Sequence, residues 1–196
     1  MNVRKLVIPL LFAAAVLFAF FFTDLGQWPA SLFNAPSDVP ANLAETYEPL
    51  SLTYVDPVHG FSVRYPLGYP LQADDGQTVT FFAPGPSGLS ESYVFQVVNE
   101  SYSAKELESI GVEEFQVDPV SMQTVSVSGR PIIRLQYLIP PEHFGESLHI
   151  VQALVPCGTY SLYFVASIPD SLRDDVALAD YSLYSAQCGP SSSDAA

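Results

Sequence analysis

Three side chains that can bind a metal ion lie close together in the chain. His143, Glu146 and His149 supply two imidazoles and one carboxylate, and groups of these types bind zinc in proteins. Their spacing differs from the HExxH pattern, in which both histidines lie on one face of a helix. Pro140-Pro141 predicts a hairpin loop here, and side chains at a strand entrance alternate sides. We therefore expect solvated loop side chains and keep a metal site as the lesser hypothesis.

Other patterns that would support catalysis are incomplete. The segment Gly85-Pro-Ser-Gly-Leu-Ser90 lacks the second glycine of the G-x-S-x-G nucleophile elbow. A calcium loop needs oxygen ligands at regular intervals, whereas Asp74-Asp75-Gly76 matches a hairpin corner. His59 lies between Pro57 and Gly60 in a predicted turn, with no nucleophile or carboxylate at a motif spacing. We therefore expect no catalytic residue and no cofactor.

The two cysteines favour a disulfide. Cys157 and Cys188 are the only cysteines in the chain, and an oxidising compartment favours their pairing. Cys157 lacks the neighbouring histidine or CxxC motif that would make it a nucleophile. Closing a loop of this length stabilises a fold by about 3 to 4 kcal/mol in the chain-entropy model.

An apolar run near the N-terminus is long enough to enter a membrane. Leu6 to Phe22 carry no charge and follow Arg4 and Lys5. At about 1.5 Å per residue, a helix of this length approaches the thickness of the hydrocarbon core of a bilayer. A retained anchor and a removed signal peptide both stay open, although signal peptides have shorter apolar cores and a small-x-small cleavage site. The positive-inside rule places the residues after Phe22 outside the cytoplasm, in a single-pass membrane protein or, after cleavage, a secreted one.

The part of the chain after Phe22 is strongly acidic. It contains five of the seven basic residues but all 21 acidic residues, which gives it a formal net charge of −16. Such a surface repels nucleic-acid phosphates and anionic lipid headgroups, although it also simply keeps an exported domain soluble. The expected partners are therefore the membrane, through the N-terminal anchor, and another exported or membrane protein, but no nucleic acid.

Composition divides the chain into five parts. A linker rich in Pro, Ala and Ser follows the apolar run, and a short polar tail ends the chain. The predicted parts are a cytoplasmic N-terminus (1–5), a transmembrane anchor or signal segment (6–22), a linker (23–49), an exported α+β domain (50–188) and a disordered tail (189–196).

Alternation with period two predicts an antiparallel sheet. A hairpin is expected between residues 52 and 65, with its turn at residues 56–60. In residues 132–139, Arg134 and Gln136 alternate with apolar residues, which predicts a partly solvated sheet. Residues 160–166 are apolar on both sides, which predicts a central strand. The six further strands are expected at residues 78–82, 92–98, 120–127, 132–139, 148–155 and 160–167.

Two helices are expected between or after the strands. Ser103-Ala-Lys-Glu106 forms a capping box, and Gly111 is the expected stop of this short helix. Asp170 or Ser171 is the expected cap of a longer helix near the C-terminus. Its apolar face is formed by Leu172, Val176, Ala179 and Leu183.

The order of these elements resembles the PsbP/Mog-like superfamily. Gly60-Phe-Ser-Val-Arg-Tyr-Pro66 is the most recognisable segment, and the capped helix and Ser128-Gly-Arg130 follow in the same order. The resemblance covers about residues 50–187 and indicates an exported prokaryotic member. It implies an α+β fold with an antiparallel sheet sandwiched between helices, here after an N-terminal transmembrane helix, and non-enzymatic binding or assembly work on a larger complex. Tyr69 stands where such proteins usually have Trp, and the cysteine pair is not a family hallmark, so no partner-specific residue is carried over.

We therefore expect a non-catalytic, membrane-tethered extracytoplasmic module that binds or assists a protein complex. Its contact surface is expected in the loops at residues 66–71 and 84–90, with Tyr69, Pro84 and Leu89 as candidate binding residues. An alternative is an exported domain that binds a small molecule or lipid between the sheet and a helix. A hydrolase or metalloenzyme around His143 and His149 is the third hypothesis. Asn99-Glu-Ser101 also matches an N-glycosylation acceptor.

Overall fold

The structure is a computed structural model that describes residues 40–189 except 75, 86–87, 128 and 143. The predicted anchor at residues 6–22 and nearly all of the predicted tail lie outside the described residues. No helix in the described part of the chain is both long and apolar enough to cross a membrane.

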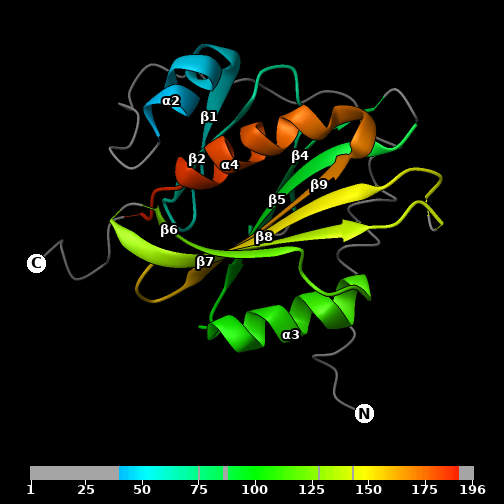
Figure 1. Cartoon of the computed structure of the whole chain (residues 1–196). Coiled ribbons are helices and arrows are strands. Elements are labelled where there is room, and N and C mark those ends of the chain that lie inside the picture. Colours follow the sequence, from blue (N-terminus) through cyan, green and yellow to red (C-terminus); the bar gives the residue numbers. More distant parts are fainter. Residues whose placement is uncertain (1–39, 75, 86–87, 128, 143, 190–196) are drawn as a thin grey trace, which may run out of the picture.

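A seven-stranded antiparallel sheet forms the centre of the molecule, and a two-stranded hairpin lies apart from it (Figure 1). The strand order in the large sheet is β3-β4-β5-β9-β8-β7-β6. The central strand, β9, is buried along its whole length, as the apolar residues on both its faces predicted. The hairpin consists of β1 (Ser51–Val55) and β2 (Ser62–Pro66), and the sheet of β3 (Leu71–Asp74), β4 (Thr78–Pro84), β5 (Ser90–Val98), β6 (Ser121–Val127), β7 (Arg130–Ile139), β8 (Leu148–Pro156) and β9 (Ser161–Pro169).

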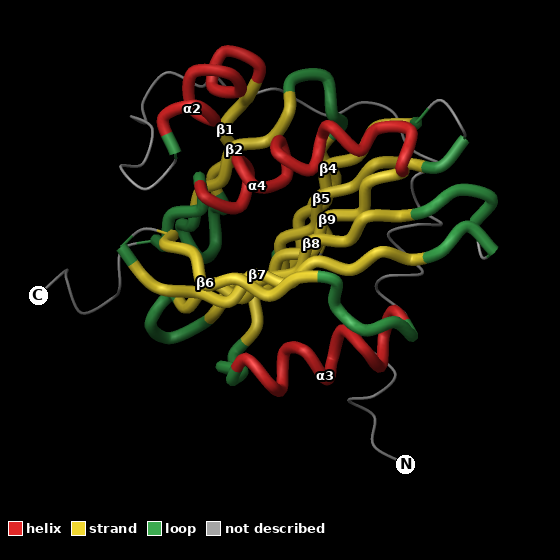
Figure 2. The backbone as a smooth tube through the Cα atoms, viewed as in Figure 1, coloured by secondary structure: helices red, strands yellow, loops and turns green. Residues whose placement is uncertain are grey.

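Helices cover both faces of the sheet, which confirms the predicted α+β sandwich (Figure 2). Helix α4 (Val176–Tyr184) lies on one face together with the hairpin and α2 (Ala41–Tyr47), and α3 (Ala104–Phe115) lies on the other. Two short 3-10 helices, η1 (Glu48–Leu50) and η2 (Asp170–Asp175), lead into β1 and α4.

Each face of the sheet has its own hydrophobic core. On the α4 side, the rings of Phe81, Phe95 and Phe164 pack in sequence, with Phe95 and Phe164 centred 4.7 Å apart. On the α3 side, Leu107 and Phe115 pack on residues of β7, β8 and β9. Burying one large apolar side chain contributes about 1.5 to 3 kcal/mol, so both helices are held mainly by these contacts.

The predicted linker is corrected at residues 41–49, which form α2 and most of η1. Leu43, Ala44 and Tyr47 pack against the core of the domain, and the Tyr47 ring lies 6.0 Å from that of Tyr181 in α4. A helix this short, with three apolar side chains, does not repeat its apolar pattern often enough to be predicted from the sequence.

The face of β7 that was expected to be partly solvated is buried at Arg134, where α4 lies over it, whereas on the same face Gln136 is half-buried and Leu138 is 40% exposed. Arg134 is only 3% exposed. Its Nε donates to Asp180 Oδ1 at 2.6 Å and its Nη2 donates to Asp180 Oδ2 at 3.1 Å. A buried guanidinium is tolerated in such a two-point pair. Alternation in the sequence does not distinguish a charge that faces water from one that faces a carboxylate on another element.

The helix boundaries differ from the predictions, although the capping box of α3 is present. Glu106 N donates to Ser103 Oγ at 3.3 Å, and Ser103 N donates to Glu106 Oε2 at 2.8 Å. Helix α3 continues through Gly111, and Gln116 takes the left-handed conformation that ends it, with φ 59°. The last helix begins later than predicted, because Leu172 has non-helical backbone angles inside η2.

Candidate functional site

Loops that are far apart in the sequence meet at one end of the sheet. The strand register brings together the β4–β5 connection, the β7–β8 connection and the end of β9. We call this surface the loop end and define it as the described residues among 84–91, 138–149 and 169–175, which leaves out 86–87 and 143 (Figure 2). The predicted candidates Pro84, Leu89, Glu146 and His149 all belong to it, which their sequence positions alone did not show.

Contacts between the β7–β8 connection and η2 fix their relative position. Asp170 N donates to Ser147 O at 2.9 Å, and Ser171 N donates to Glu146 Oε2 at 2.9 Å. His149 Nε2 lies 3.0 Å from Asp170 Oδ1. Glu146 therefore binds a backbone amide at the start of η2, and His149 pairs with the aspartate beside it.

The weak metal hypothesis gains no support from this arrangement. Glu146 and His149 both contact η2, as just described, and His143 lies outside the described residues. Among the described residues, no group of three or more His, Cys, Asp or Glu side chains is arranged to hold a metal ion.

The β4–β5 connection presents Pro84 to solvent and turns Leu89 partly inward. Gly85 N donates to Leu89 O at 2.6 Å, and Gly88 takes a positive φ of 87°. Leu89 packs against the core on the α3 side, whereas Pro84 is exposed. Of these two predicted binding residues, Pro84 is the one that a partner reaches directly.

Tyr69, the third predicted binding residue, points into the protein. Its hydroxyl donates to Glu91 Oε2 at 2.6 Å, and its ring lies 5.7 Å from that of Tyr93 in an edge-to-face contact. The Tyr93 hydroxyl donates to Glu91 Oε1. Glu91 itself has 0% exposure. Tyr69 thus links the β2–β3 loop to β5, and its contact with a partner stays a prediction.

Glu91 also faces a second carboxyl group. Burial raises the pKa of Glu91 to about 7, and the nearby charge of Asp175 adds to this rise, while the two tyrosine hydroxyls oppose it. Burial raises the pKa of Asp175 as well, and the two carboxyl groups are hydrogen-bonded to each other. A proton shared between the two carboxyl groups allows them to lie next to each other. Glu91, Asp175, Tyr69 and Tyr93 together form a cluster that joins β5, the β2–β3 loop and the start of α4.

A related cluster lies on the opposite face of the sheet, beneath α3. Tyr137 OH donates to Gln152 Oε1 at 2.8 Å, and Gln152 Nε2 donates to Tyr163 OH at 2.7 Å. Tyr163 is hydrogen-bonded to Glu114 of α3, whose pKa burial raises to about 7. The sequence analysis missed Glu91 and Glu114, because a single acidic residue at a strand start or in a helix resembles an ordinary surface residue.

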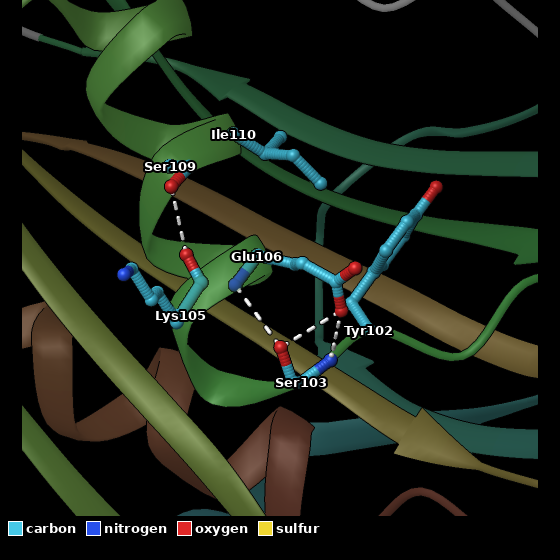
Figure 3. A pocket seen from close by; sticks show the side chains of 6 residues that line it. All are labelled: Tyr102, Ser103, Lys105, Glu106, Ser109 and Ile110. Carbon is cyan, nitrogen blue, oxygen red and sulfur yellow. Dashed lines mark hydrogen bonds between the residues drawn. The ribbon is translucent and has the colours of Figure 1, made fainter.

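The space between α3 and the sheet leaves no room for a ligand at Gly111. A Cβ atom added to Gly111 would lie 2.0 Å from Tyr137 OH and 2.6 Å from Gln152 Oε1. A depression of about 560 Å³ lies instead beside the first turns of α3 (Figure 3). Its polar side chains Ser103 and Glu106 are bound to each other in the helix cap. The arrangement does not favour the predicted ligand site between sheet and helix.

His59 lies in the β1–β2 turn, where the sequence placed it. Asp56 Oδ2 accepts hydrogen bonds from the backbone amides of Val58, at 3.0 Å, and of His59. The His59 Nδ1 atom lies 3.2 Å from the same oxygen. Asp56 is only 4% exposed, so this pair shapes a turn.

The opposite end of the molecule is closed by the predicted disulfide. Cys157 and Cys188 are bonded, with their Cα atoms 5.2 Å apart. Cys157 follows β8 and Cys188 follows α4, so the bond ties the β8–β9 turn to the chain that leaves the last helix.

Apolar and charged side chains are exposed at the loop end, and most of the charged ones are acidic. Leu138 and Phe144 are each 40% exposed. Pro84 adds a further exposed apolar side chain. The exposed charged residues here are Glu142, Asp170, Arg173 and Asp174.

Comparison with known proteins shows the fold and nothing finer. No family model and no curated protein sequence matches the chain. The Ran-binding protein Mog1p of Saccharomyces cerevisiae has a TM-score of 0.51 and 9% identity, over 70% of this chain and 95% of Mog1p. Cyanobacterial PsbP (CyanoP) of Synechocystis has a TM-score of 0.49 and 13% identity, over 84% of this chain and 98% of that protein. A Bacteroides thetaiotaomicron protein has a TM-score of 0.48 and 12% identity over 71% of this chain, which spans only 48% of that protein. The likeness to Mog1p confirms the predicted PsbP/Mog-like fold.

Proposed function

We propose that the chain is a non-catalytic extracytoplasmic module, tethered to a membrane by residues 6–22, that binds a protein partner at the loop end. The apolar run after Arg4 and Lys5 supports the tether. The disulfide supports an oxidising compartment. Mog1p has the same fold and is described as a Ran-binding protein, which supports a binding role for this architecture.

The observation that carries the proposal is the composition of the loop end. Exposed Leu138 and Phe144 supply apolar contact area, and exposed Glu142, Asp170 and Asp174 supply negative charge. Apolar side chains at the centre of an interface contribute most of its affinity, and charges around them set partner choice and association rate. The expected partner is therefore an exported or membrane protein with a basic face that also carries apolar side chains.

Hydrogen bonds join several described segments of the loop end to each other and to the sheet. The hydrogen bonds from Asp170 and Ser171 to the β7–β8 connection hold two of its segments in place. The buried Glu91 cluster holds the start of α4 against β5. A surface that is fixed in advance loses less conformational entropy on binding.

The strongly shifted carboxyl groups support a structural role more than a catalytic one. Glu91 is fully buried, and both its oxygens accept hydrogen bonds from tyrosines. A general acid or base must reach a substrate directly or through one water molecule. Glu91 has no surface at which a substrate could meet it.

The test is a crosslinked pull-down of the full-length chain from its native membranes. The loop-end variant carries Leu138→Ser and Phe144→Ser. The matched control carries Val55→Ser and Val58→Ser, because these two valines are also exposed apolar residues but lie at the β1–β2 turn. We expect one specific protein with the wild type and the control, and at least a tenfold lower recovery with the loop-end variant. Raising the salt concentration should also lower recovery, because exposed charges are screened.

Two results would count against this function. Equal recovery by the loop-end variant and the control would show that the partner binds elsewhere. Recovery of a lipid or small molecule without any protein would favour the alternative ligand-binding function.

A further inference from the structure

We propose that a second apolar surface, formed by residues 49–50 and 66–70, rests on the lipid surface of the membrane and orients the domain there. We call this surface the apolar tip. The inference rests on the tether at residues 6–22 that is part of the proposed function.

The apolar tip is formed where η1 meets the end of β2. Leu67 N donates to Leu50 O at 2.8 Å, which holds the two leucines side by side. Leu50 is 55% exposed and Leu67 is 57% exposed. Pro49, Gly68 and Pro70 are exposed as well. The tip therefore presents two leucine side chains among prolines.

The turn that carries Leu67 is fixed by the residue two positions later. Tyr69 N donates to Pro66 O at 3.3 Å, and the Tyr69 hydroxyl is bound to buried Glu91. Gly68 takes a φ of 89°, which favours glycine. With Tyr69 turned inward, Leu67 is turned outward, so the exposure of this leucine is built into the turn.

The apolar tip is uncharged within a strongly acidic chain. Residues 49–55 and 65–73 contain no Asp, Glu, Lys or Arg, whereas the whole chain has a net charge of −14. Four charged residues flank these segments in the sequence. Glu48 and Arg64 form an ion pair at 3.1 Å, and Asp56 and Asp74 lie at the ends of β1 and β3 that point away from the apolar tip. An uncharged apolar surface approaches a zwitterionic lipid surface without the repulsion that the rest of the domain would meet.

The tip also lies near the point where the tether enters the domain. Helices α2 and η1 lead from Pro40 directly to Leu50, and at about 1.5 Å per residue they span about 15 Å. Residues 23–39, between the apolar run and the domain, reach about 60 Å at most when extended. Helix α2 and the β1–β2 hairpin lie together on the α4 side of the sheet (Figure 1). The tethered chain therefore enters the domain next to the apolar tip and keeps it within reach of the bilayer.

Tethering explains why so small a surface is sufficient. Two leucines provide too little apolar area to hold an acidic domain on a membrane by themselves. A linker of this length keeps the domain at a high effective concentration near the lipid, so a weak contact is populated. The residues of the tip include exposed leucines and prolines without a charged side chain, although Asp174 and Asp175 lie near Tyr47 and Tyr69 at its edge. A zwitterionic lipid surface is therefore the occupant that fits it.

The test uses tryptophan fluorescence quenching by brominated lipid. Trp28 is the only tryptophan in the chain, so Trp28→Phe gives a background in which one reporter is added at a time. The tip reporter is Leu67→Trp, and the matched control is Val58→Trp, at a residue that is 67% exposed on the β1–β2 turn. Full-length proteins are reconstituted into vesicles of brominated phosphatidylcholine. We expect at least twofold quenching of the tip reporter and almost none of the control.

The wild-type protein separates failure of the tip from failure of the tether. If Trp28 is quenched but Leu67→Trp is quenched no more than Val58→Trp, the tip is wrong and the tether remains. If the chains do not float with the vesicles at all, both the tether and the tip are overturned. A second reporter at Leu50→Trp should behave like the one at Leu67, and a lack of quenching at both positions would exclude a local effect of one substitution.

Discussion

Glu91 shows how the environment of a single residue changes what its side chain does. This carboxyl group is sealed from solvent between Tyr69 and Tyr93 and faces Asp175. Ionising it would place a charge in a region of low polarity beside another acid. The protonated form is therefore the one that suits the folded protein.

The first prediction concerns the pH dependence of stability. The folded pKa of Glu91, about 7, lies above the ordinary value of 4.5, so the folded state binds more protons than the unfolded state between these values. The free energy of unfolding should therefore fall as the pH rises from about 4.5 to about 7. Glu91→Gln should reduce this fall by about 1 to 3 kcal/mol, measured by urea unfolding at pH 5 and pH 8.

A matched control for this prediction is Glu142→Gln, because Glu142 is exposed. This substitution should change the pH dependence of the free energy of unfolding very little. Part of the fall should persist in Glu91→Gln, because burial raises the pKa of Glu114 as well. Parallel stability curves for wild type and Glu91→Gln would show that Glu91 is ionised equally in both states.

Single residues were predictable from sequence where the cause is local. The capping box at Ser103 and the turn at His59 depend on neighbours in the chain, and both are present. The two cysteines needed only their number and compartment. The burial of Arg134 and the inward orientation of Tyr69 were not predictable, because their partners, Asp180 and Glu91, lie on other elements.

At the level of elements, Gly111 determines how closely α3 approaches the sheet. The sequence suggested that this glycine ends the helix, but the helix continues through it and packs it against Tyr137. Glycine inside a helix normally costs about 1 kcal/mol relative to alanine. Here its missing side chain makes room for the hydroxyl and amide groups of the sheet.

The second prediction is that Gly111→Ala destabilises the protein by about 1 to 2 kcal/mol, because overpacking at this contact outweighs the usual gain in helix propensity. Urea unfolding measures the change. Ser109→Ala, on the exposed side of the same helix, is the matched control and should be nearly neutral. Adding Tyr137→Phe should restore part of the loss. A stabilising effect of Gly111→Ala would show that α3 is held less closely than described.

The longer strands were predicted well because their alternation extends over many residues, whereas the four-residue β3 was not predicted. The weaker points were short elements and boundaries. Helix α2 is too short to show a period, and the late start of α4 depends on Leu172, whose backbone leaves the helical region inside η2. Neither feature has a clear local sequence signal.

At the scale of the whole molecule, one covalent bond closes the end opposite to the proposed binding surface. The Cys157–Cys188 disulfide spans a sequence separation of 31 residues. In the chain-entropy model, a bond of this span removes unfolded-state entropy worth about 3 to 4 kcal/mol.

The third prediction is that reducing this disulfide lowers the free energy of unfolding by about 3 to 4 kcal/mol, measured by urea unfolding with and without dithiothreitol. A chain with both Cys157→Ser and Cys188→Ser should start from the lower value and not respond to the reductant. Binding at the loop end should persist in the reduced protein under mild conditions, because that surface lies at the far end of the sheet. A reductant effect in the double variant would point to a cause other than this bond.

The overall architecture was predictable from sequence, but the binding surface was not. The sandwich follows from strand and helix patterns, which are set by local periodicity. The loop end depends on which strand ends become neighbours in a seven-stranded sheet. Sequence suggested residues 84–90 as a contact loop but did not show that Phe144 and Leu138 lie at the same end.

The position of β9 has a consequence for the order in which the sheet assembles. Strands β3 to β5 and strands β6 to β8 each form a continuous antiparallel unit, and β9 is the strand that joins them. Because β9 comes after all the others in the chain, β5 and β8 each keep an unpaired edge until residues 161–169 enter the sheet. Such edges invite pairing with other chains. A chain that is still being synthesised is therefore exposed to aggregation until β9 takes its place at the centre of the sheet.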